Sequence, residues 1–307
     1  MTASFKQVFF DNKFTDISEA HLPINTTAIQ YGLGVFGGIR AYYNKDEDKF
    51  CLFRINDHYS RFQSSIKVLG CDFNYSHEQL IEINIELLKR NKPNSNVYFR
   101  PFAYSNSQIL GPNLSKVTLA YALYMIPLEE YMPMENGLSL MVSSWRRVSD
   151  NAIPSRGKFS SAYMNSALAR KEANDSGFDE AILLSEAGNV CEGSAENIFV
   201  VRDGVLITPC PSDDILEGIT RRTIIQIAKD MGIPVEVRTL DRSELYIADE
   251  LFLSGTGCQI AWANSVDRRI IGDGKMGKIT SQLKDKYFNI VYGKDQQYKD
   301  WCTKVTV

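Results

Sequence analysis

The chain has 307 residues, 44% of them hydrophobic and 23% charged, which is typical of a soluble globular protein of about two domains. The net charge of -3 argues against a dedicated nucleic-acid-binding protein, because such a protein carries a basic patch. Three histidines and six scattered cysteines without a CxxC pair argue against a zinc site. The chain has no run of 18 apolar residues and no basic segment leading into an apolar one at its start, so we expect a cytoplasmic enzyme without a membrane span.

Residues 1–125 alternate short strands and helices and are predicted to form a small N-terminal domain. Asn56 and Asp57 are predicted to cap its first long helix. Ser76 with Gln79 forms a capping box for the next helix. The predicted elements of this domain are strands at 6–10, 96–105 and 117–125, and helices at 56–69 and 76–91.

Gly32, Gly34 and Gly37 spell the G-x-G-x-x-G pattern of dinucleotide-binding proteins. That motif needs a helix after its glycines, whereas these glycines run into the strand-like segment 39–43. No acidic residue follows at the distance that a ribose hydroxyl requires. A nicotinamide-dependent dehydrogenase is therefore the weaker alternative, and the glycines more plausibly let the backbone pass close to a ligand or a neighbouring chain.

Residues 126–137 contain two prolines, several charges and a glycine, and are predicted to link the two domains. Residues 138–307 are predicted to form the larger domain, in which Asp203-Gly204 is the turn signal of a hairpin. The predicted elements of this domain are strands at 138–144, 180–184 and 249–253, and helices at 160–175, 216–232 and 279–292.

Two segments of the larger domain are candidate phosphate sites. Gly218, Ile219 and Thr220 form the first turn of a predicted helix, where free backbone N–H groups and a threonine hydroxyl favour anion binding. The segment 254–257, Ser-Gly-Thr-Gly, follows a strand and is a second candidate anion loop. Each signal is weak by itself.

Lys158 and Glu192 stand in an order that suits pyridoxal phosphate chemistry. Lys158 lies in an irregular segment before an alanine-rich helix, and Glu192 follows about thirty residues later, after a strand and a turn. The lysine would hold the cofactor as a Schiff base, and the carboxylate would keep its pyridine nitrogen protonated. Spacing alone does not single out Lys158 from the other lysines, for which a solvated surface position is the usual role.

The segments SSWRR, IPSRGK, AYMNSALA and EGSAENIF resemble the branched-chain amino-acid aminotransferases, which are class IV pyridoxal-phosphate enzymes of fold type IV. The similarity extends from YGLGVFGGIR to SGTG near residue 255. It implies a two-domain α/β (α+β) fold with a small α/β N-terminal domain. The larger C-terminal domain would combine a mixed sheet or pseudo-barrel with helices, and the cofactor would bind between domains. The resemblance also implies a homodimer, because the family's small domain lends loop residues to the partner's site.

The resemblance further implies a role for each site residue. Lys158 would be the catalytic residue, first carrying pyridoxal 5′-phosphate and then acting as acid and base at the substrate α-carbon. The cofactor would be bound by Lys158, Glu192, Tyr163, Arg61, Thr256 and the backbone amides of Ile219 and Thr220. The substrate would be bound by Tyr31, Phe36, Tyr98, Arg100 and Tyr131, with the amides of Gly257 and Cys258 holding its α-carboxylate.

The implied reaction is the reversible transfer of an amino group between branched-chain L-amino acids (leucine, isoleucine and valine) and 2-oxoglutarate. It yields branched-chain 2-oxo acids and L-glutamate. Aromatic residues suit the aliphatic side chain, and Arg100 suits the second carboxylate of glutamate. The implied partners are therefore small-molecule substrates and a second copy of the chain, with no metal, nucleic acid or membrane.

The sequence departs from the family pattern near the substrate side. Gly37 stands where a glutamate is usual, Phe159 and the two serines after it where small residues are usual, and Ala162 where an asparagine is usual. These departures leave the preference among amino acids open. D-amino-acid aminotransferases and aminodeoxychorismate lyases of the same fold are alternatives, against which stand Glu196-Asn197, SSWRR and VYFRP.

Two further questions stay open at the level of sequence. A non-catalytic pyridoxal carrier or interaction protein is the alternative of a different class. Cys191 and Cys258 lie beside the candidate site and are either oxidation-sensitive thiols or, as we expect, small buried apolar residues.

Overall fold

The computed structural model describes residues 5–115, 117–132 and 135–307. The chain divides into two compact units. The first unit comprises Met1–Glu129, Gly157–Ser161 and Asn289–Val307, and the second comprises Glu130–Arg156 and Ala162–Phe288. The first unit thus includes the short segment that carries Lys158 and the C-terminal end of the chain. The domain limits expected from the sequence, residues 125 and 138, stay a prediction.

The described part of the first unit contains an eight-stranded antiparallel sheet. Its strands follow the order β17-β5-β4-β6-β7-β1-β2, and β3 pairs with β6 beside this path. Buried aromatic residues such as Phe50 and Phe99 fill the strands and form the core. The strands are β1 Gln7–Phe10, β2 Lys13–Asp16, β3 Gly34–Phe36, β4 Ile39–Asn44, β5 Lys49–Phe53, β6 Val97–Tyr104, β7 Ala120–Pro127 and β17 Cys302–Val305.

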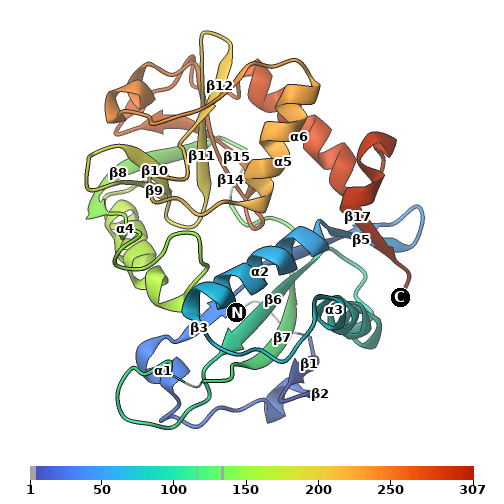
Figure 1. The fold of residues 1–307 in the computed structure, drawn as a ribbon. Helices are drawn as coiled ribbons and strands as arrows, with labels where there is room; N and C mark the ends of the chain where they lie inside the picture. The colour runs from blue at the N-terminus through green and yellow to red at the C-terminus, as the bar shows by residue number, and fades with distance from the viewer. Residues whose placement is uncertain (1–4, 116, 133–134) are drawn as a thin grey trace. The chain divides into compact units, whose positions relative to one another are not determined.

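The helices of the first unit pack against this sheet, with α2 contacting α3 and β3, and α3 contacting β1 (Figure 1). Their bounds are α1 Thr27–Tyr31, α2 Ile55–Leu69 and α3 His77–Asn91, with 3₁₀ turns η1 Ile17–Glu19 and η4 Gln296–Trp301. The capping box predicted for α3 is confirmed. Ser76 Oγ accepts from the Gln79 amide at 3.2 Å, and Gln79 Oε1 accepts from the Ser76 amide at 2.8 Å.

The cap predicted for α2 is wrong. Arg54 occupies the N-cap position in the left-handed conformation, with φ of 50°, and Asn56 and Asp57 lie inside the first helical turn. Asp57 instead pairs with Arg54, whose Nε lies 2.8 Å from its carboxylate. An acidic residue in the first turn still favours the helix, because it interacts with the helix dipole.

The second unit is built on a nine-stranded mixed sheet in the described residues. Six of its strands close into a ring, β10-β9-β8-β15-β14-β11, because β11 also pairs with β10. β8 runs parallel to β9 and to β15, and the other pairs of the ring are antiparallel. This barrel confirms the expected fold class. The strands are β8 Leu138–Arg146, β9 Glu180–Leu184, β10 Val190–Gly193, β11 Asn197–Arg202, β12 Val205–Thr208, β13 Val235–Val237, β14 Glu250–Gly255, β15 Gln259–Val266 and β16 Arg269–Ile270.

Strand β9 of the barrel buries both of its faces. Leu140, Ile182 and Ile198 belong to one buried apolar cluster of the second unit. Ala181 and Leu183, which alternate with Ile182 along β9, instead pack with Ala169 and Ala173 of α4. A strand that is apolar on both faces is therefore covered on both sides, as the run of apolar residues in β9 indicates.

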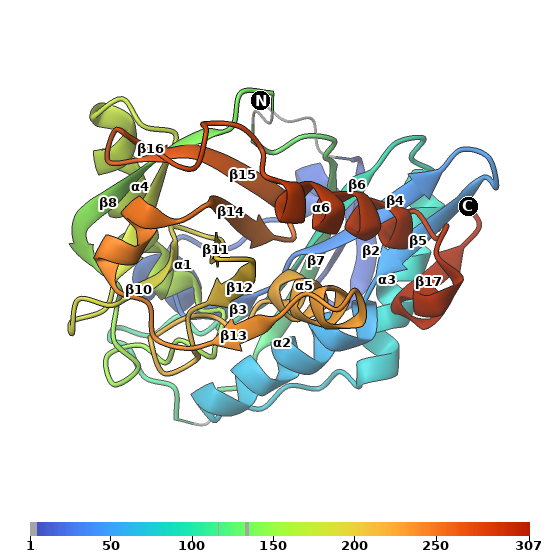
Figure 2. The same cartoon turned by 90° about the horizontal axis from the view of Figure 1, so that it is seen from above.

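The helices of the second unit lie outside the barrel strands, with α4 against β8 and β9, and α5 beside β13 and β14 (Figure 2). Their bounds are α4 Tyr163–Asp175, α5 Ile219–Asp230 and α6 Lys278–Val291, with the 3₁₀ turn η3 Arg242–Ile247. The 3₁₀ turn η2 Ser160–Ala162 begins in the first unit, to which the residues of α6 from Asn289 onward also belong. The three predicted helices are confirmed, although α4 and α5 each begin three residues later than expected. The hairpin turn at Asp203-Gly204 is also confirmed, since both residues have positive φ.

A disulfide bond joins Cys51 of β5 to Cys302 of β17, residues that are 251 positions apart. The sequence analysis did not predict this bond or the strand β17. In the described part of the chain, no helix combines the length and the apolar character that a membrane crossing requires.

Candidate active site

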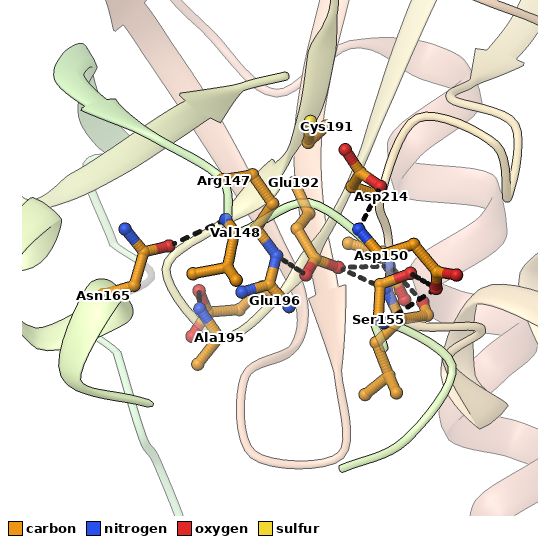
Figure 3. Close-up of polar contacts among 12 residues, drawn as sticks. Arg147, Val148, Asp150, Ser155, Asn165, Cys191, Glu192, Ala195, Glu196 and Asp214 are labelled. Atoms are coloured by element: carbon orange, nitrogen blue, oxygen red, sulfur yellow. Dashed lines mark hydrogen bonds and ion pairs between the residues drawn. The ribbon is translucent and has the colours of Figure 1, made fainter. Parts of the chain in front are cut away.

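Glu192 is a buried carboxylate at the centre of a polar network in the second unit (Figure 3). Its Oε1 lies 3.0 Å from Nε of Arg147, an ion pair in which the N–H bond is not aligned for a hydrogen bond. Its Oε2 accepts hydrogen bonds from Asn197 Nδ2 at 3.1 Å and from the Leu216 amide at 3.0 Å. Two hydrogen-bond donors and one arginine charge thus stabilise its negative charge and fix its direction.

Arg147 is placed by the backbone around it. Its amide donates to the Leu184 carbonyl at 2.8 Å, just beyond the end of β8. Asn165 of α4 binds the residues on either side. It accepts from the Val148 amide at 3.3 Å (Figure 3) and donates to the Arg146 carbonyl at 2.9 Å. The arginine therefore approaches Glu192 from a segment that is held at both ends.

The predicted phosphate turn lies next to this network along the chain. Gly218 is the N-cap of α5, and Ile219 and Thr220 are the buried first residues of the helix. Arg221 fixes the helix to β12, since its Nε donates to Thr208 Oγ1 at 3.2 Å and its Nη2 to the Pro209 carbonyl at 2.8 Å. The amides of the first turn are thus presented by a rigidly held helix end.

The first two residues of the second predicted anion loop, Ser254 and Gly255, are the last residues of β14. Ser254 is buried, and its hydroxyl has no hydrogen-bond partner among the described residues. The ring of Tyr131 covers Gly257, because a β-carbon added there would lie 3.5 Å from the ring. The structure therefore brings together Tyr131 and Gly257, two predicted substrate residues. Partial burial raises the pKa of Tyr131, and the neighbouring Glu196 carboxylate adds to this effect.

Lys158 is anchored in the first unit through its backbone. Its carbonyl accepts from the Phe36 amide at 3.0 Å, and its amide donates to Ser65 Oγ at 3.2 Å. Ser65 lies one turn after Arg61 on α2 and donates to the Arg61 carbonyl at 2.9 Å. One serine therefore links the predicted catalytic lysine to the predicted phosphate-binding arginine.

Phe36 joins Lys158 to the predicted substrate residues of the first unit. Lys158 Nζ lies 5.0 Å from the centre of the Phe36 ring, and Arg100 Cζ lies 4.7 Å from the same centre. Arg100 also contacts the Tyr98 ring and donates to the Tyr98 hydroxyl at 3.3 Å. Two cations thus share one aromatic ring. Tyr31 is held by another segment, since its hydroxyl accepts from the Gly111 amide at 2.9 Å.

The remaining predicted residues belong to the second unit. Tyr163 is the first residue of α4, and Thr256 follows β14, each half-buried. Cys258 and Cys191 are buried, and burial raises the pKa of the Cys191 thiol well above its usual value. This burial agrees with their reading as small apolar residues.

The glycines of the G-x-G-x-x-G pattern serve close packing within the first unit. A β-carbon on Gly34 would lie 2.6 Å from the Phe102 ring, and one on Gly37 would lie 2.7 Å from Pro101. The strand β4 follows them instead of a helix. The dinucleotide alternative is therefore contradicted. The contact at Pro101 also explains why no side chain is tolerated at position 37 in this packing.

The donor set fits pyridoxal phosphate. Glu192 is a fixed carboxylate suited to a protonated ring nitrogen, and the α5 turn is suited to a phosphate. The buried hydroxyl of Ser254, the first residue of the second anion loop, has unused hydrogen-bonding capacity. Within the described ranges, no group of three or more histidine, cysteine, aspartate or glutamate residues is arranged to hold a metal ion.

Comparison with known proteins agrees with this donor set. Residues 34–266 match the family described as amino-transferase class IV. A probable branched-chain-amino-acid aminotransferase of Aquifex aeolicus is 45% identical over 298 residues, covering 97% of this chain and 96% of that protein. The chain therefore belongs to the class IV aminotransferases, and within them to the branched-chain-amino-acid aminotransferase family, which confirms the resemblance seen in the sequence.

Two solved structures of this family have the same fold. The branched-chain aminotransferase of Thermoproteus uzoniensis with norvaline is 39% identical, with a TM-score of 0.94, and the match covers 98% of this chain and 99% of that one. The branched-chain amino acid aminotransferase of Thermobaculum terrenum in its PLP form is 34% identical, with a TM-score of 0.95 and 99% coverage of both chains.

The sequence analysis did not identify three residues that contact predicted site residues: Arg147, Asn197 and Ser65. Arg147 lies in the motif SSWRR and Asn197 in the motif EGSAENIF, and this was the available signal for both residues. The sequence alone does not show that both contact Glu192. Ser65 carried no local signal for the site, because its partner Lys158 lies 93 residues away in the chain.

Proposed function

We propose that this chain is a branched-chain-amino-acid aminotransferase that transfers the α-amino group between leucine, isoleucine or valine and 2-oxoglutarate, with pyridoxal 5′-phosphate as cofactor. The observation that carries the proposal is the buried Glu192 carboxylate, oriented by Arg147, Asn197 and the Leu216 amide. Such a carboxylate suits a protonated pyridine ring. Membership of the family supports the same conclusion.

Bound pyridoxal phosphate supplies an electron sink for the α-carbon of the amino acid. Lys158 would hold the cofactor covalently, and its amine would carry the proton that leaves the α-carbon of the amino acid. Glu192 keeps the ring nitrogen protonated throughout.

The other predicted residues bind and orient the cofactor and the substrates. The phosphate is held by Arg61, the amides of Ile219 and Thr220, and Thr256, with Tyr163 beside the ring. The α-carboxylate is held by the amides of Gly257 and Cys258 below Tyr131. Phe36, Tyr98 and Tyr31 receive the aliphatic side chain, and Arg100 receives the second carboxylate of glutamate. The cluster of Phe36, Tyr98 and Arg100 supports this last role, because it offers apolar surface and a cation together.

We also propose a homodimer. Four large apolar residues are exposed on α1 and on the loops near it in the first unit: Ile24, Ile29, Ile109 and Leu110. The two segments that carry them are joined by hydrogen bonds, including Thr27 amide to Ser107 carbonyl at 2.8 Å. A second copy is the partner that would cover this surface, as in the family to which the chain belongs. Light scattering of the purified protein tests it, and a monomer would contradict the proposal.

The metabolite substrates point to the cytoplasm as the place of action, which subcellular fractionation tests. The activity itself is tested by supplying the protein with L-leucine and 2-oxoglutarate and measuring L-glutamate. Glutamate formation that requires both substrates is expected. Activity with D-leucine in place of L-leucine, or pyruvate release from aminodeoxychorismate without a 2-oxo acid, would favour one of the two related enzymes instead.

A further inference from the structure

Asn197 is a buried amide at the start of β11 that contacts two parts of the candidate site at once. Its Nδ2 donates to Glu192 Oε2 at 3.1 Å and to the Leu216 carbonyl at 2.8 Å. The Leu216 amide donates to the same carboxylate oxygen at 3.0 Å. The amide, the carboxylate and the peptide of Leu216 thus form a closed set of hydrogen bonds just ahead of α5.

The other end of the amide lies against the N-cap of α5. A β-carbon added to Gly218 would lie only 2.1 Å from Asn197 Oδ1. Gly218 has φ of -64° and ψ of 140°, a conformation that any residue adopts, so the backbone angles do not require glycine. Space requires it, because the side chain of Asn197 occupies the place of a β-carbon. Both ends of one amide are therefore engaged.

We propose that Asn197 is a positioning residue that sets the spacing between the Glu192 carboxylate and the first turn of α5. The inference rests on the proposed function, in which Glu192 faces the ring nitrogen and the α5 turn binds the phosphate. The ring nitrogen and the phosphate are joined through the ring and a short methylene ester, so their separation can vary only within a narrow range. A site that binds both must therefore hold its carboxylate and its phosphate turn within that range.

Glu192 is held to the segment before α5 by the Asn197 side chain and also by the Leu216 backbone amide. Loss of the asparagine amide removes the bonds to Glu192 and Leu216, while the bond from the Leu216 amide to Glu192 is retained. The remaining bond leaves the carboxylate in place but frees the turn to shift. We therefore expect Asn197→Ala to weaken pyridoxal phosphate binding by about tenfold, the effect of losing one hydrogen bond to a charged group.

Gly218 provides a matched test through a double-mutant cycle. Gly218→Ala alone should also weaken binding, because the new methyl group displaces the asparagine amide. In the Asn197→Ala background the clash is gone, so the double variant should bind the cofactor no more weakly than Asn197→Ala by itself. Such non-additivity is the signature of two residues in direct contact. Asn197→Asp keeps the shape but removes the donor, and should weaken binding at least as much as Asn197→Ala.

The control is Asn174→Ala. Asn174 also donates hydrogen bonds from its side-chain amide to two backbone carbonyls of the second unit, those of Phe178 at 2.9 Å and Asp179 at 3.3 Å. It is exposed, and it is not among the residues of the candidate site. We expect the Asn174→Ala variant to bind pyridoxal phosphate with the affinity of the wild-type protein.

Two measurements on each variant test whether Asn197 positions the first turn of α5 relative to Glu192. The first is the dissociation constant of pyridoxal phosphate from the apoprotein, followed by absorption and fluorescence. The second needs no cofactor: amide hydrogen exchange of residues 216–220 in the apoprotein, which Asn197→Ala should accelerate several-fold relative to wild type and Asn174→Ala.

Wild-type affinity and unchanged exchange in both Asn197→Ala and Asn197→Asp would overturn the inference, as would additive losses in the double variant. If the wild-type protein fails to bind pyridoxal phosphate at all, the proposed function fails. The exchange experiment then still reports whether Asn197 ties the turn to Glu192, so the two failures are distinguished.

Discussion

Arg147 and Glu192 form a nearly buried ion pair, with 3.0 Å between Nε and Oε1 and with 11% and 8% of their side chains exposed. Removing one partner of such a pair leaves an uncompensated charge away from water. The carboxylate that we propose for the ring nitrogen is thus also a buried charge with Arg147 as its ion-pair partner.

Arg147→Met should therefore lower the free energy of unfolding of the apoprotein by about 3 kcal/mol or more. Adding Glu192→Leu should recover much of this loss, because no unpaired charge remains. Arg156→Met is the control, since Arg156 pairs with Asp150 and Glu217 in ion pairs that are about half exposed. Urea unfolding gives the free energy of unfolding of the wild-type protein, the two single variants and the double variant. A loss in Arg147→Met no larger than in Arg156→Met would contradict the account.

Lys158→Ala should reduce the rate of amino transfer by at least about a thousandfold, because both the covalent attachment and the proton transfer depend on its amine. The fold should be retained, since the hydrogen bonds of Lys158 with Phe36 and Ser65 are made by its backbone. Single-turnover kinetics with L-leucine measure the rate. Lys171→Ala, at an exposed ion pair on α4, is the control and should keep full activity.

Arg100→Met should raise KM for 2-oxoglutarate by about 10- to 100-fold, the effect of losing a charged hydrogen bond, with little change in KM for leucine. The reason is that only the acidic substrate needs the cation beside Phe36 and Tyr98. Steady-state kinetics with each substrate varied separately give both values, and Arg100→Lys should be intermediate. Equal increases in both KM values would assign Arg100 a structural role instead.

Cys191 and Cys258 should resist alkylation in the native protein. Both are buried, and burial raises the pKa of the Cys191 thiol, so that almost none of it is ionised at neutral or mildly alkaline pH. Cys71 and Cys210 are partly exposed and should react before them. Mass spectrometry after iodoacetamide treatment at about pH 8 measures the order. Rapid labelling of Cys191 would revive its reading as an oxidation-sensitive thiol.

Elements with local signals were predictable from the sequence. The Ser76–Gln79 capping box, the Asp203-Gly204 turn and the apolar run of β9 each encode their structure within a few residues, and each was confirmed. The family resemblance supplied the barrel and the reaction, and the comparisons bear out both. Local reasoning failed at the start of α2, because Arg54 adopts a left-handed conformation that its residue type does not favour.

The long-range relationships were not predictable. The disulfide between Cys51 and Cys302 and the contact of Ser65 with Lys158 join segments that no periodicity relates. The place of Asn197 against Gly218 depends on how β11 meets α5, and the glycine gives no sign of it because its backbone angles are ordinary. The predicted roles of the site residues stay predictions until they are tested by substitution.

The most direct test of the central claim is the visible absorption spectrum of the purified protein, loaded with pyridoxal phosphate, during titration with L-leucine and no oxo acid. The account predicts a band from the lysine-bound cofactor that leucine removes and 2-oxoglutarate restores, because the two half-reactions share one cofactor. A band that ignores L-leucine but responds to a D-amino acid would overturn the substrate. Failure to form any band in the wild-type protein, with excess cofactor present, would contradict the roles of both Lys158 and Glu192.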